Sequence, residues 1–177
     1  MVDKAAAYLQ SLDEAKGRFE QTDARGVVSG GELYLKRPGK ARFVYDEPSG
    51  VVVVSDGATV LVTDPRLKSA NRYPLSATPL ALFLTKQVRL DRGVAVSAVE
   101  HFQGGFSLTA YDVRHPAQGH IVLSFSDEPV ALREWRLIDG QGRTTTVRLA
   151  ELAATSGLDS ALFYVPPPMQ RAGSARF

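Results

Sequence analysis

The chain has 177 residues, of which 44% are hydrophobic and 23% are charged, and its formal net charge is +2. These values are typical of one folded domain covering residues 1–177 and exclude a disordered chain, while the apolar runs are shorter than the roughly 20 residues of a membrane helix. The scattered Lys and Arg residues argue against nucleic-acid binding, and the absence of cysteine excludes disulfides, thiol catalysis and cysteine-ligated metals.

The first residues, MVDKAAAYLQSLDEA, lack the apolar core and the small-residue cleavage site of a secretory signal. Two interpretations remain: a cytosolic protein, or a protein whose targeting segment has been removed. Residues 3–15 place Ala6, Leu9 and Leu12 at helical spacing, with Asp3 as the expected N-cap. We therefore expect one short amphipathic helix at the start of the chain.

From residue 16 the hydrophobic period changes from that of a helix to that of a strand. Strands are expected over 16–22, 27–36 and 40–47, and on both sides of Asp56-Gly57, which is a strong hairpin signal. After residue 92, further strands are expected over 93–103, 105–113, 119–127, 130–139 and 142–152. This regular spacing is typical of an antiparallel meander and predicts a mainly β protein.

The region 65–92 interrupts the strands and contains one compact apolar block, PLALFLTK. Thr78 as N-cap and Pro79 at the first helical position favour a helix start. The apolar residues cover most of the helix circumference, unlike the single stripe of a surface helix; they are Leu80, Leu82, Phe83 and Leu84. Two interpretations remain open: this helix is ordinary core, or it encloses an apolar ligand cavity together with the sheet.

The segment ELYLKRPGKARFVYDEP, residues 32–48, predicts a β-hairpin around its Pro-Gly pair. In the first strand Leu33 and Leu35 share one face, and the next residue on that face is Arg37. An unpaired buried guanidinium is costly and does not lose its proton. Arg37 is therefore either at a solvated rim or held by specific acceptors.

The loop of this hairpin decides which residues share a face with Arg37. A two-residue Pro-Gly loop is disfavoured because its twist opposes that of the strands. A three-residue loop over 38–40 pairs Arg37 with Ala41 and gathers the apolar residues on one face, so we expect this register. The apolar residues on that face are Leu33, Leu35, Phe43 and Tyr45.

The sequence offers little for catalysis. The three histidines, His101, His115 and His120, are not spaced as metal ligands, and no Gly-x-Ser-x-Gly motif is present. The segment GQGRTTT, residues 140–146, lacks the Lys-Ser/Thr ending of a phosphate loop and leads into a strand. We expect no enzymatic activity, no catalytic residue, no metal and no cofactor.

Several motifs follow the order seen in the periplasmic outer-membrane lipoprotein carrier (LolA) family, and the chain resembles that family over nearly its whole length. The motifs are GRFEQ at 17–21, GGELYLKRPGKARFVYDEP at 30–48, VVSDGATVLVTDP at 53–65, TPLALFLTK at 78–86 and LFYVPPPMQ at 162–170. The sequence departs from the family pattern at Ala41, where a larger apolar residue is frequent, and at Pro168-Met169, where glycine is usual.

The resemblance implies an unclosed half-barrel, a strongly curved antiparallel sheet whose concave apolar face is covered by a short helical lid. It also implies a periplasmic carrier that takes lipid-modified lipoproteins from an inner-membrane ABC-type releasing complex to an outer-membrane receptor, as a monomer. By the same resemblance Arg37 is the lid latch. The expected acyl-chain cavity residues are Leu33, Leu35, Phe43, Tyr45, Leu80, Phe83 and Leu84.

We expect Arg37 to bind carbonyl groups at the end of the lid helix, because terminal carbonyls lack intrahelical partners. A closed lid would then compete with acyl chains for the concave face. Two other functions stay open at this stage. One is a regulatory module of the same fold that senses lipid or lipoprotein, and the other is an enzyme acting on a lipid ester, which is disfavoured because no nucleophile–base pair is evident.

Overall fold

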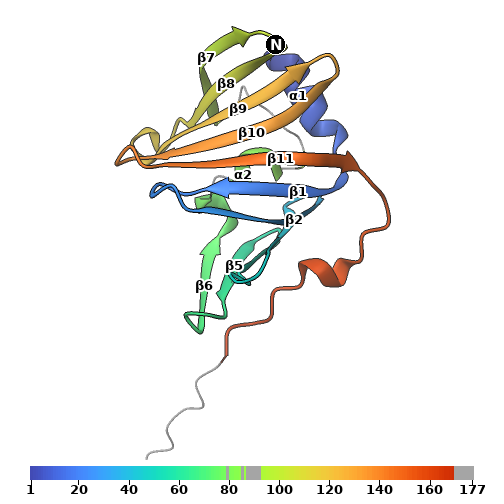
Figure 1. Cartoon of the computed structure of the whole chain (residues 1–177), viewed down its shortest axis with the longest axis vertical. Helices are drawn as coiled ribbons and strands as arrows, with labels where there is room; N and C mark the ends of the chain where they lie inside the picture. Colours follow the sequence, from blue (N-terminus) through green and yellow to red (C-terminus); the bar gives the residue numbers. More distant parts are fainter. Residues whose placement is uncertain (79, 85, 87–92, 170–177) are drawn as a thin grey trace, which may run out of the picture.

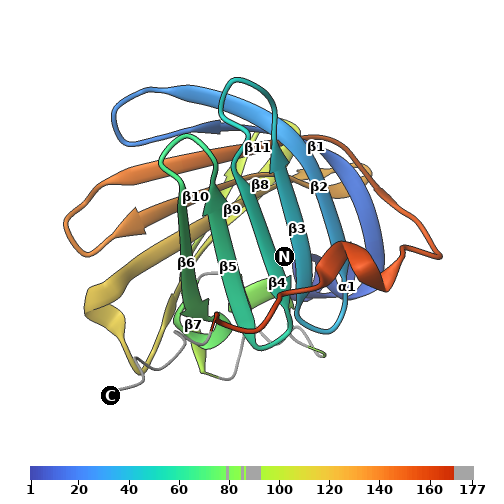
Figure 2. The same ribbon diagram turned by 90° about the horizontal axis from the view of Figure 1, so that it is seen from below.

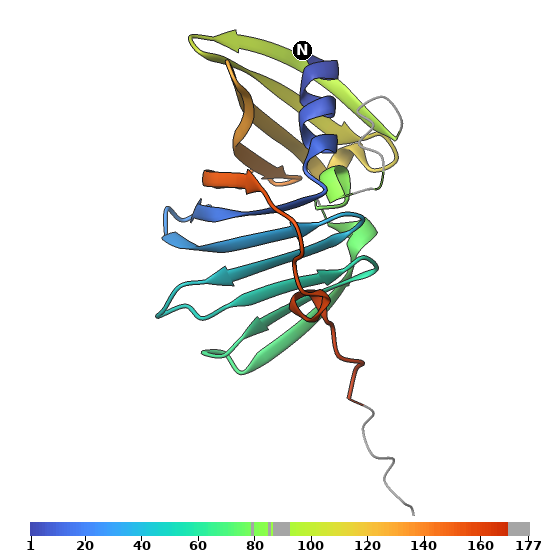
Figure 3. The same ribbon diagram turned by 90° about the vertical axis from the view of Figure 1, so that its right-hand side faces the viewer.

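The computed structural model of the chain describes residues 1–78, 80–84, 86 and 93–169, apart from the side chain of Phe83. It contains an eleven-stranded antiparallel sheet in the order β6-β5-β4-β3-β2-β1-β11-β10-β9-β8-β7. The sheet bends strongly, and its edge strands β6 and β7 lie at opposite ends of the molecule (Figures 1 and 3). The prediction of a mainly β, curved and unclosed antiparallel sheet is confirmed.

The first half of the sheet consists of β1 Glu14–Thr22, β2 Val28–Lys36, β3 Lys40–Tyr45, β4 Val52–Asp56, β5 Thr59–Asp64 and β6 Ser69–Pro74. The second half consists of β7 Val94–Phe102, β8 Gly105–Asp112, β9 Gly119–Asp127, β10 Val130–Asp139 and β11 Thr144–Ala154. The helices are α1 Val2–Ser11 and α2 Ala81–Leu84, and the 3-10 helices are η1 Leu75–Ala77, η2 Pro116–Gln118 and η3 Ser160–Phe163.

Helices α1 and α2 lie on the same, concave side of the sheet (Figure 3). Helix α1 packs on β10 and buries Ala5 and Leu9. These side chains join one apolar core with residues of the sheet and with Leu84 of α2. The amphipathic helix expected at the chain start is thus confirmed, and its apolar stripe explains why it covers the sheet. It ends at Ser11 and not at residue 15, because β1 already begins at Glu14.

Two details of the helix ends differ from the sequence predictions. Helix α1 begins at Val2, with Met1 at the N-cap position, so the prediction of Asp3 as N-cap is wrong. Asp3 instead lies in the first turn, where a carboxylate is favoured by the helix dipole. Thr78 ends η1 and its hydroxyl donates to the Leu75 carbonyl oxygen at 2.8 Å, while α2 begins only at Ala81.

Strand β6 was not predicted from the sequence. It lies in the region 65–92, which was expected to interrupt the strands. Its residues, SANRYP, show no apolar alternation, and all but one of them are exposed. The strand exists because it pairs with β5 over six residue pairs, from Thr59–Pro74 to Asp64–Ser69. An edge strand of this kind is formed by backbone hydrogen bonds and needs no buried face, so hydrophobic period does not reveal it.

The β2–β3 hairpin has the expected face but not the expected register. Ala41 pairs with Leu35, so the predicted pairing of Arg37 with Ala41 is wrong by two residues. The backbone N–H of Arg37 donates to the Asp13 carbonyl oxygen at 2.8 Å, which removes Arg37 from the ladder and makes 37–39 the loop. A shift of two residues keeps each side chain on its face, so the predicted apolar set stays together.

The chain after β11, residues 155–169, forms a C-terminal strap across the convex face of the sheet (Figure 2). Within the strap, η3 contacts β3 and β4, and Phe163 is only 2% exposed. Val54 and Leu61 are also buried, although strand alternation directs them to the convex face. Phe163 therefore closes a small apolar cluster outside the main core.

Polar contacts fix the strap to the strands below it. The Glu14 carboxylate accepts the backbone N–H of Leu158 at 2.8 Å, and this bond is the main reason that the pKa of Glu14 is lowered. Lys36 donates to the Leu158 carbonyl oxygen at 2.9 Å, and Arg42 donates to that of Leu162 at 3.2 Å. The strap is thus docked by side chains of β1, β2 and β3.

Replacing Phe163 by alanine should lower the free energy of unfolding by about 3 kcal/mol, because a large buried ring is removed and its cavity remains. Chemical denaturation of the purified protein measures this change. The neighbouring Tyr164 is 65% exposed, so Tyr164→Ala is the matched control and should change stability by less than about 0.5 kcal/mol. Equal effects of the two substitutions would contradict the role of Phe163 as the anchor of the strap.

Candidate functional site

The predicted cavity residues of β2 and β3 lie together on the concave face. Leu33, Leu35 and Phe43 are 1%, 6% and 6% exposed. Tyr45 is half-buried, and its hydroxyl donates to the Gln21 side-chain oxygen at 2.8 Å. Burial raises the pKa of Tyr45, so this hydroxyl remains protonated. The face is apolar, with one satisfied polar group among the aromatic rings.

Aromatic rings fill the middle of the concave face. Phe19 contacts Phe43 edge-to-face, with 5.5 Å between ring centroids, and Tyr45 in the same way at 5.0 Å. Phe43 also meets Trp135 of β10 at 6.4 Å. Such edge-to-face pairs add to the stabilisation that comes from burial alone. The two halves of the sheet are therefore joined through side chains across the concave side.

The predicted lid residues pack against the same core. Leu84 is 1% exposed and belongs to the core cluster, and Leu80 is partly buried against it. Phe83 is part of α2, but its side chain lies outside the described part of the chain. In this conformation the lid and the concave face bury each other, and the residues predicted to bind acyl chains form a packed interior.

Arg37 binds the carboxyl end of α1. Its Nη2 donates to the Leu9 carbonyl oxygen at 2.7 Å, and its Nε donates to that of Leu12 at 3.1 Å. The Leu9 carbonyl also accepts the backbone N–H of Leu12 at 3.3 Å. Carbonyl groups at this end of a helix carry the negative end of the helix dipole, so a guanidinium is a favourable second donor. Burial lowers the pKa of Arg37, and the Asp13 carboxylate opposes this effect. The guanidinium stays charged at neutral pH.

The same turn also holds the end of α2. The backbone N–H of Gly39 donates to the Leu84 carbonyl oxygen at 2.6 Å, and the buried Ser55 hydroxyl donates to the Gly39 carbonyl oxygen at 2.6 Å. Gly39 has φ +75°, and a Cβ here would lie 2.6 Å from the Cα of Gly57. Only glycine fits this position. We call residues 37–39 the latch turn.

The sequence left two interpretations for Arg37, a solvated rim position or a position held by specific acceptors. The structure shows that specific acceptors hold it. Two hydrogen bonds of its guanidinium lead to the carbonyl oxygens of Leu9 and Leu12 at the end of the N-terminal helix, a partner that was not predicted from the sequence. The Leu84 carbonyl of α2 accepts the backbone N–H of Gly39. Residues 37–39 thus connect both helices to one hairpin.

An open cavity of about 650 Å³ lies next to α2, at the edge of the sheet where β1, β8 and β10 end. Its volume is within the usual range of about 300–1,000 Å³ for small-molecule sites. Its apolar lining comes from the helix and the strands: Ala81, Leu82, Ala110, Ile121 and Leu137. None of the predicted site residues whose side chains the structure describes lines this cavity.

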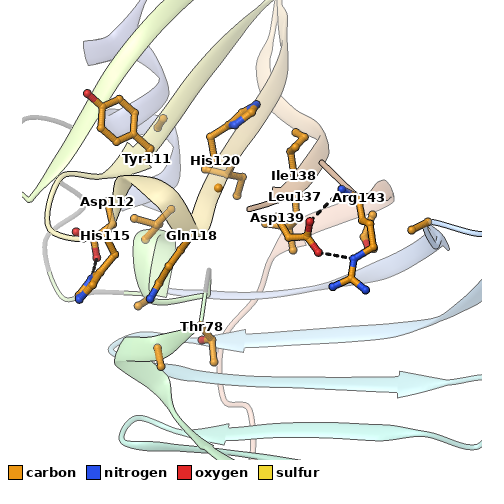
Figure 4. Close-up of a pocket in the computed structure, with 18 of the residues that line it drawn as sticks. Thr78, Tyr111, Asp112, His115, Gln118, His120, Leu137, Ile138, Asp139 and Arg143 are labelled. Atoms are coloured by element: carbon orange, nitrogen blue, oxygen red, sulfur yellow. Dashed lines mark hydrogen bonds and ion pairs between the residues drawn. The ribbon is translucent and has the colours of Figure 1, made fainter. Parts of the chain in front are cut away.

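Polar side chains surround the mouth of the cavity (Figure 4). Asp139 and Arg143 form an ion pair, and the Asp112 carboxylate lies within hydrogen-bond distance of Nδ1 of His115. Gln118 extends from the β8–β9 connection on the side of His115 (Figure 4). The cavity therefore combines an apolar interior with a polar mouth, as expected of a site for an amphiphilic molecule.

A second, shallower groove of about 880 Å³ lies on the other side of α2, between the latch turn and the β4–β5 turn. Ser76 of η1 and Ala81 of α2 line both the cavity and the groove, so these two elements lie between the two spaces. Leu84 lines the groove as well as belonging to the core.

The residues of the mouth were not among the sites predicted from the sequence. They lie in or beside the short connections that follow the strands expected over 16–22, 105–113 and 130–139. The available signal was that the turns after β1, β8 and β10 must meet at one edge of an antiparallel sheet, and that each carries an aspartate near a basic residue. Their gathering around a cavity depends on the curvature of the sheet.

Within the described residues, no group of three His, Cys, Asp or Glu side chains could hold a metal ion. Among the helices the structure describes, none has the length and apolar character required to traverse a membrane.

Comparison with known proteins gives one consistent family. The family model described as outer membrane lipoprotein carrier protein LolA matches residues 10–166. The outer-membrane lipoprotein carrier protein of Methylobacillus flagellatus is 24% identical over 177 residues, which cover 94% of this chain and 85% of that protein. That of Methylococcus capsulatus is 28% identical over 171 residues, covering 93% and 79%. These alignments span most of both chains.

The fold is shared with solved structures at low identity. The crystal structure of a LolA superfamily protein from Nitrosomonas europaea matches with a TM-score of 0.52 at 10% identity, covering 93% of this chain and 96% of the other. At this identity the match concerns the fold alone.

Replacing Ser55 by alanine should lower the free energy of unfolding by about 1–2 kcal/mol, because the Gly39 carbonyl loses a donor in a buried position. Thermal or chemical denaturation measures this loss. Ser97 forms the same kind of hydroxyl-to-carbonyl bond, to Thr109 at 3.4 Å, but in an exposed position. Ser97→Ala is therefore the matched control and should be nearly neutral. A neutral Ser55→Ala would show that this bond does not stabilise the latch turn.

Proposed function

The chain belongs to the outer membrane lipoprotein carrier protein LolA family, and we propose that it binds the acyl chains of lipoproteins and carries them through the periplasm to the outer membrane. The observation that carries this proposal is the closure of an apolar concave face by two helices that end on one latch turn. No second function is favoured by a specific observation, so the regulatory alternative is set aside.

The lid is proposed to open when acyl chains bind. Opening would break the bonds from Arg37 to Leu9 and Leu12 and the bond from Gly39 to Leu84, and it would expose the core residues beneath the helices. Acyl chains then replace the helix side chains on the concave face. The predicted residues of β2, β3 and α2 are the proposed lining of this open state.

Release is the harder requirement for a carrier. Burial of an acyl chain is worth about 0.8 kcal/mol per methylene, so several long chains in a permanently open trough would leave only very slowly. A lid that closes favourably lowers the net affinity by its closing free energy. Hydrogen bonds to charged groups contribute about 1.5–3 kcal/mol, so the Arg37 bonds are large enough to matter.

The transfer partners are proposed from family membership. The carrier would receive its cargo from an inner-membrane ABC-type lipoprotein-releasing complex and deliver it to an outer-membrane receptor, acting as a monomer and without catalysis or cofactor. The open cavity beside α2 supports entry of the acyl chains from this side, since residues of η1 and α2 line it.

Arg37→Leu should tighten acyl binding by about tenfold or more and slow the release of cargo, because the closed state loses its charged bonds. Affinity for a triacylated lipopeptide and its rate of transfer to acceptor vesicles measure both effects. Arg66→Leu removes the same charge from an exposed turn and is the control. A variant that releases lipopeptide as fast as the unmodified protein would contradict the latch.

The carrier function itself is tested by stoichiometric transfer. Donor vesicles containing a triacylated lipoprotein are mixed with the purified protein and then with acceptor membranes. We expect one soluble complex per carrier and movement of the lipoprotein to the acceptor without chemical change. Retention of the lipoprotein in the donor, or the appearance of a cleaved lipid, would contradict the proposal.

A further inference from the structure

The mouth of the cavity carries aspartates that contact basic side chains of their own turns. After β10, the Asp139 carboxylate accepts Nε of Arg143 at 2.7 Å and the backbone N–H of Gln141 at 2.9 Å. After β8, the Asp112 carboxylate accepts the backbone N–H of Arg114. Its other oxygen lies 3.2 Å from Nδ1 of His115. Figure 4 shows both pairs at the rim of the cavity.

The turn after β1 repeats this arrangement. Asp23 accepts the backbone N–H of Arg25 at 2.8 Å and that of Val27 at 2.9 Å, and its second oxygen lies 3.5 Å from the Arg25 guanidinium. Both residues line the cavity. In each of these three turns backbone N–H groups donate to the aspartate and hold it in place. The same carboxylate also contacts a basic side chain of its turn.

The aspartates of these turns remain ionised at neutral pH. Backbone N–H donors are the leading cause that lowers their pKa: that of Val27 for Asp23, that of Arg114 for Asp112 and that of Arg143 for Asp139. Hydrogen bonds to a carboxylate favour its charged form. Each of these carboxylates has a guanidinium partner in its own turn: Arg25 for Asp23, Arg114 for Asp112 and Arg143 for Asp139.

Uncharged hydrogen-bonding groups complete the mouth. Gln118 lines the cavity, and the structure describes no partner for its side-chain amide. An amide supplies two N–H donors and one carbonyl acceptor. It suits the ester and amide carbonyls that join acyl chains to glycerol or to a peptide, and it gives no charge to a phosphate or a carboxylate.

We propose that this mouth makes the cavity selective for acyl lipids whose polar group is uncharged, such as a diacylglyceryl or an acylated peptide group, against lipids with an anionic headgroup. The proposal rests on the proposed acyl-binding function. An anion at the mouth would meet basic groups already occupied by Asp139, Asp112 and Asp23, so it would lose hydration without gaining a counter-charge. A neutral ester group needs no counter-charge, and its carbonyl can accept a hydrogen bond from the Gln118 amide.

Such selectivity has a physical advantage for a carrier. The membrane from which cargo is taken contains a large excess of other two-chain lipids, and the acyl chains alone do not distinguish them. Because an apolar wall gains the same free energy from each chain, discrimination must come from the polar group. A mouth whose guanidinium groups are already paired supplies this discrimination, because an anionic headgroup would lose its hydration there without gaining a partner.

The test compares two ligands with identical chains, dihexanoylglycerol and dihexanoyl phosphatidic acid, in low-salt buffer at neutral pH. Displacement of a fluorescent acyl probe from the full chain measures both affinities. We expect dihexanoylglycerol to bind about threefold or more tightly than the phosphatidic acid, from exposed charge interactions of about 0.2–1 kcal/mol each. Equal affinities, or tighter binding of the phosphatidic acid, would overturn the selectivity.

Asp139→Asn and Asp112→Asn then test the residues. An asparagine oxygen still accepts the backbone N–H groups, so each turn is kept while its charge is removed. Each variant should improve binding of the phosphatidic acid about threefold and leave that of dihexanoylglycerol unchanged. Asp64→Asn is the matched control, because Asp64 accepts the N–H groups of Arg66 and Leu67 in a turn away from the cavity.

The outcomes separate this inference from the proposed function. If neither lipid nor the lipopeptide binds, acyl binding itself fails. If both lipids bind equally and the Asp139→Asn and Asp112→Asn variants behave like Asp64→Asn, acyl binding stands and the charge selectivity is wrong.

Discussion

The structure depends on one hairpin loop that satisfies the ends of two helices. Helix α1 ends on the guanidinium of Arg37, and α2 ends on the backbone N–H of Gly39, two residues away. Terminal carbonyls buried against a sheet would be costly without donors. Because both sets of donors belong to the latch turn, the closed arrangement of the helices over the concave face is tied to the conformation of residues 37–39.

This constraint gives a simple account of how one apolar surface serves both stability and cargo binding. In the closed state the concave face is a packed core, with Leu84 and the α1 residues buried among aromatic rings of the sheet. In the proposed open state acyl chains occupy the same place. The free energy of closure then subtracts from the affinity for cargo, and a carrier needs this subtraction to release what it binds.

The two ends of the strands have different roles. The latch turn follows β2 at one end of the β1–β2 pair, whereas the turn after β1 lies at the opposite end and surrounds the cavity together with the turns after β8 and β10. Elements η1 and α2 lie between the cavity and the groove and line both. Entry, selection by the polar group and closure can therefore be changed by separate substitutions, although all three act on the same ligand.

The sequence by itself determined α1, the strands other than β6, and the family, through hydrophobic period, turn residues and short motifs. It also placed Leu33, Leu35 and Phe43 on one face, because alternation survives an error of two in register. Tertiary structure alone decided that Arg37 binds α1, that β6 is a strand and that Asp23, Asp112 and Asp139 meet at one mouth. Local pattern fixes which face a side chain takes, whereas the curvature of the sheet fixes which distant groups it meets.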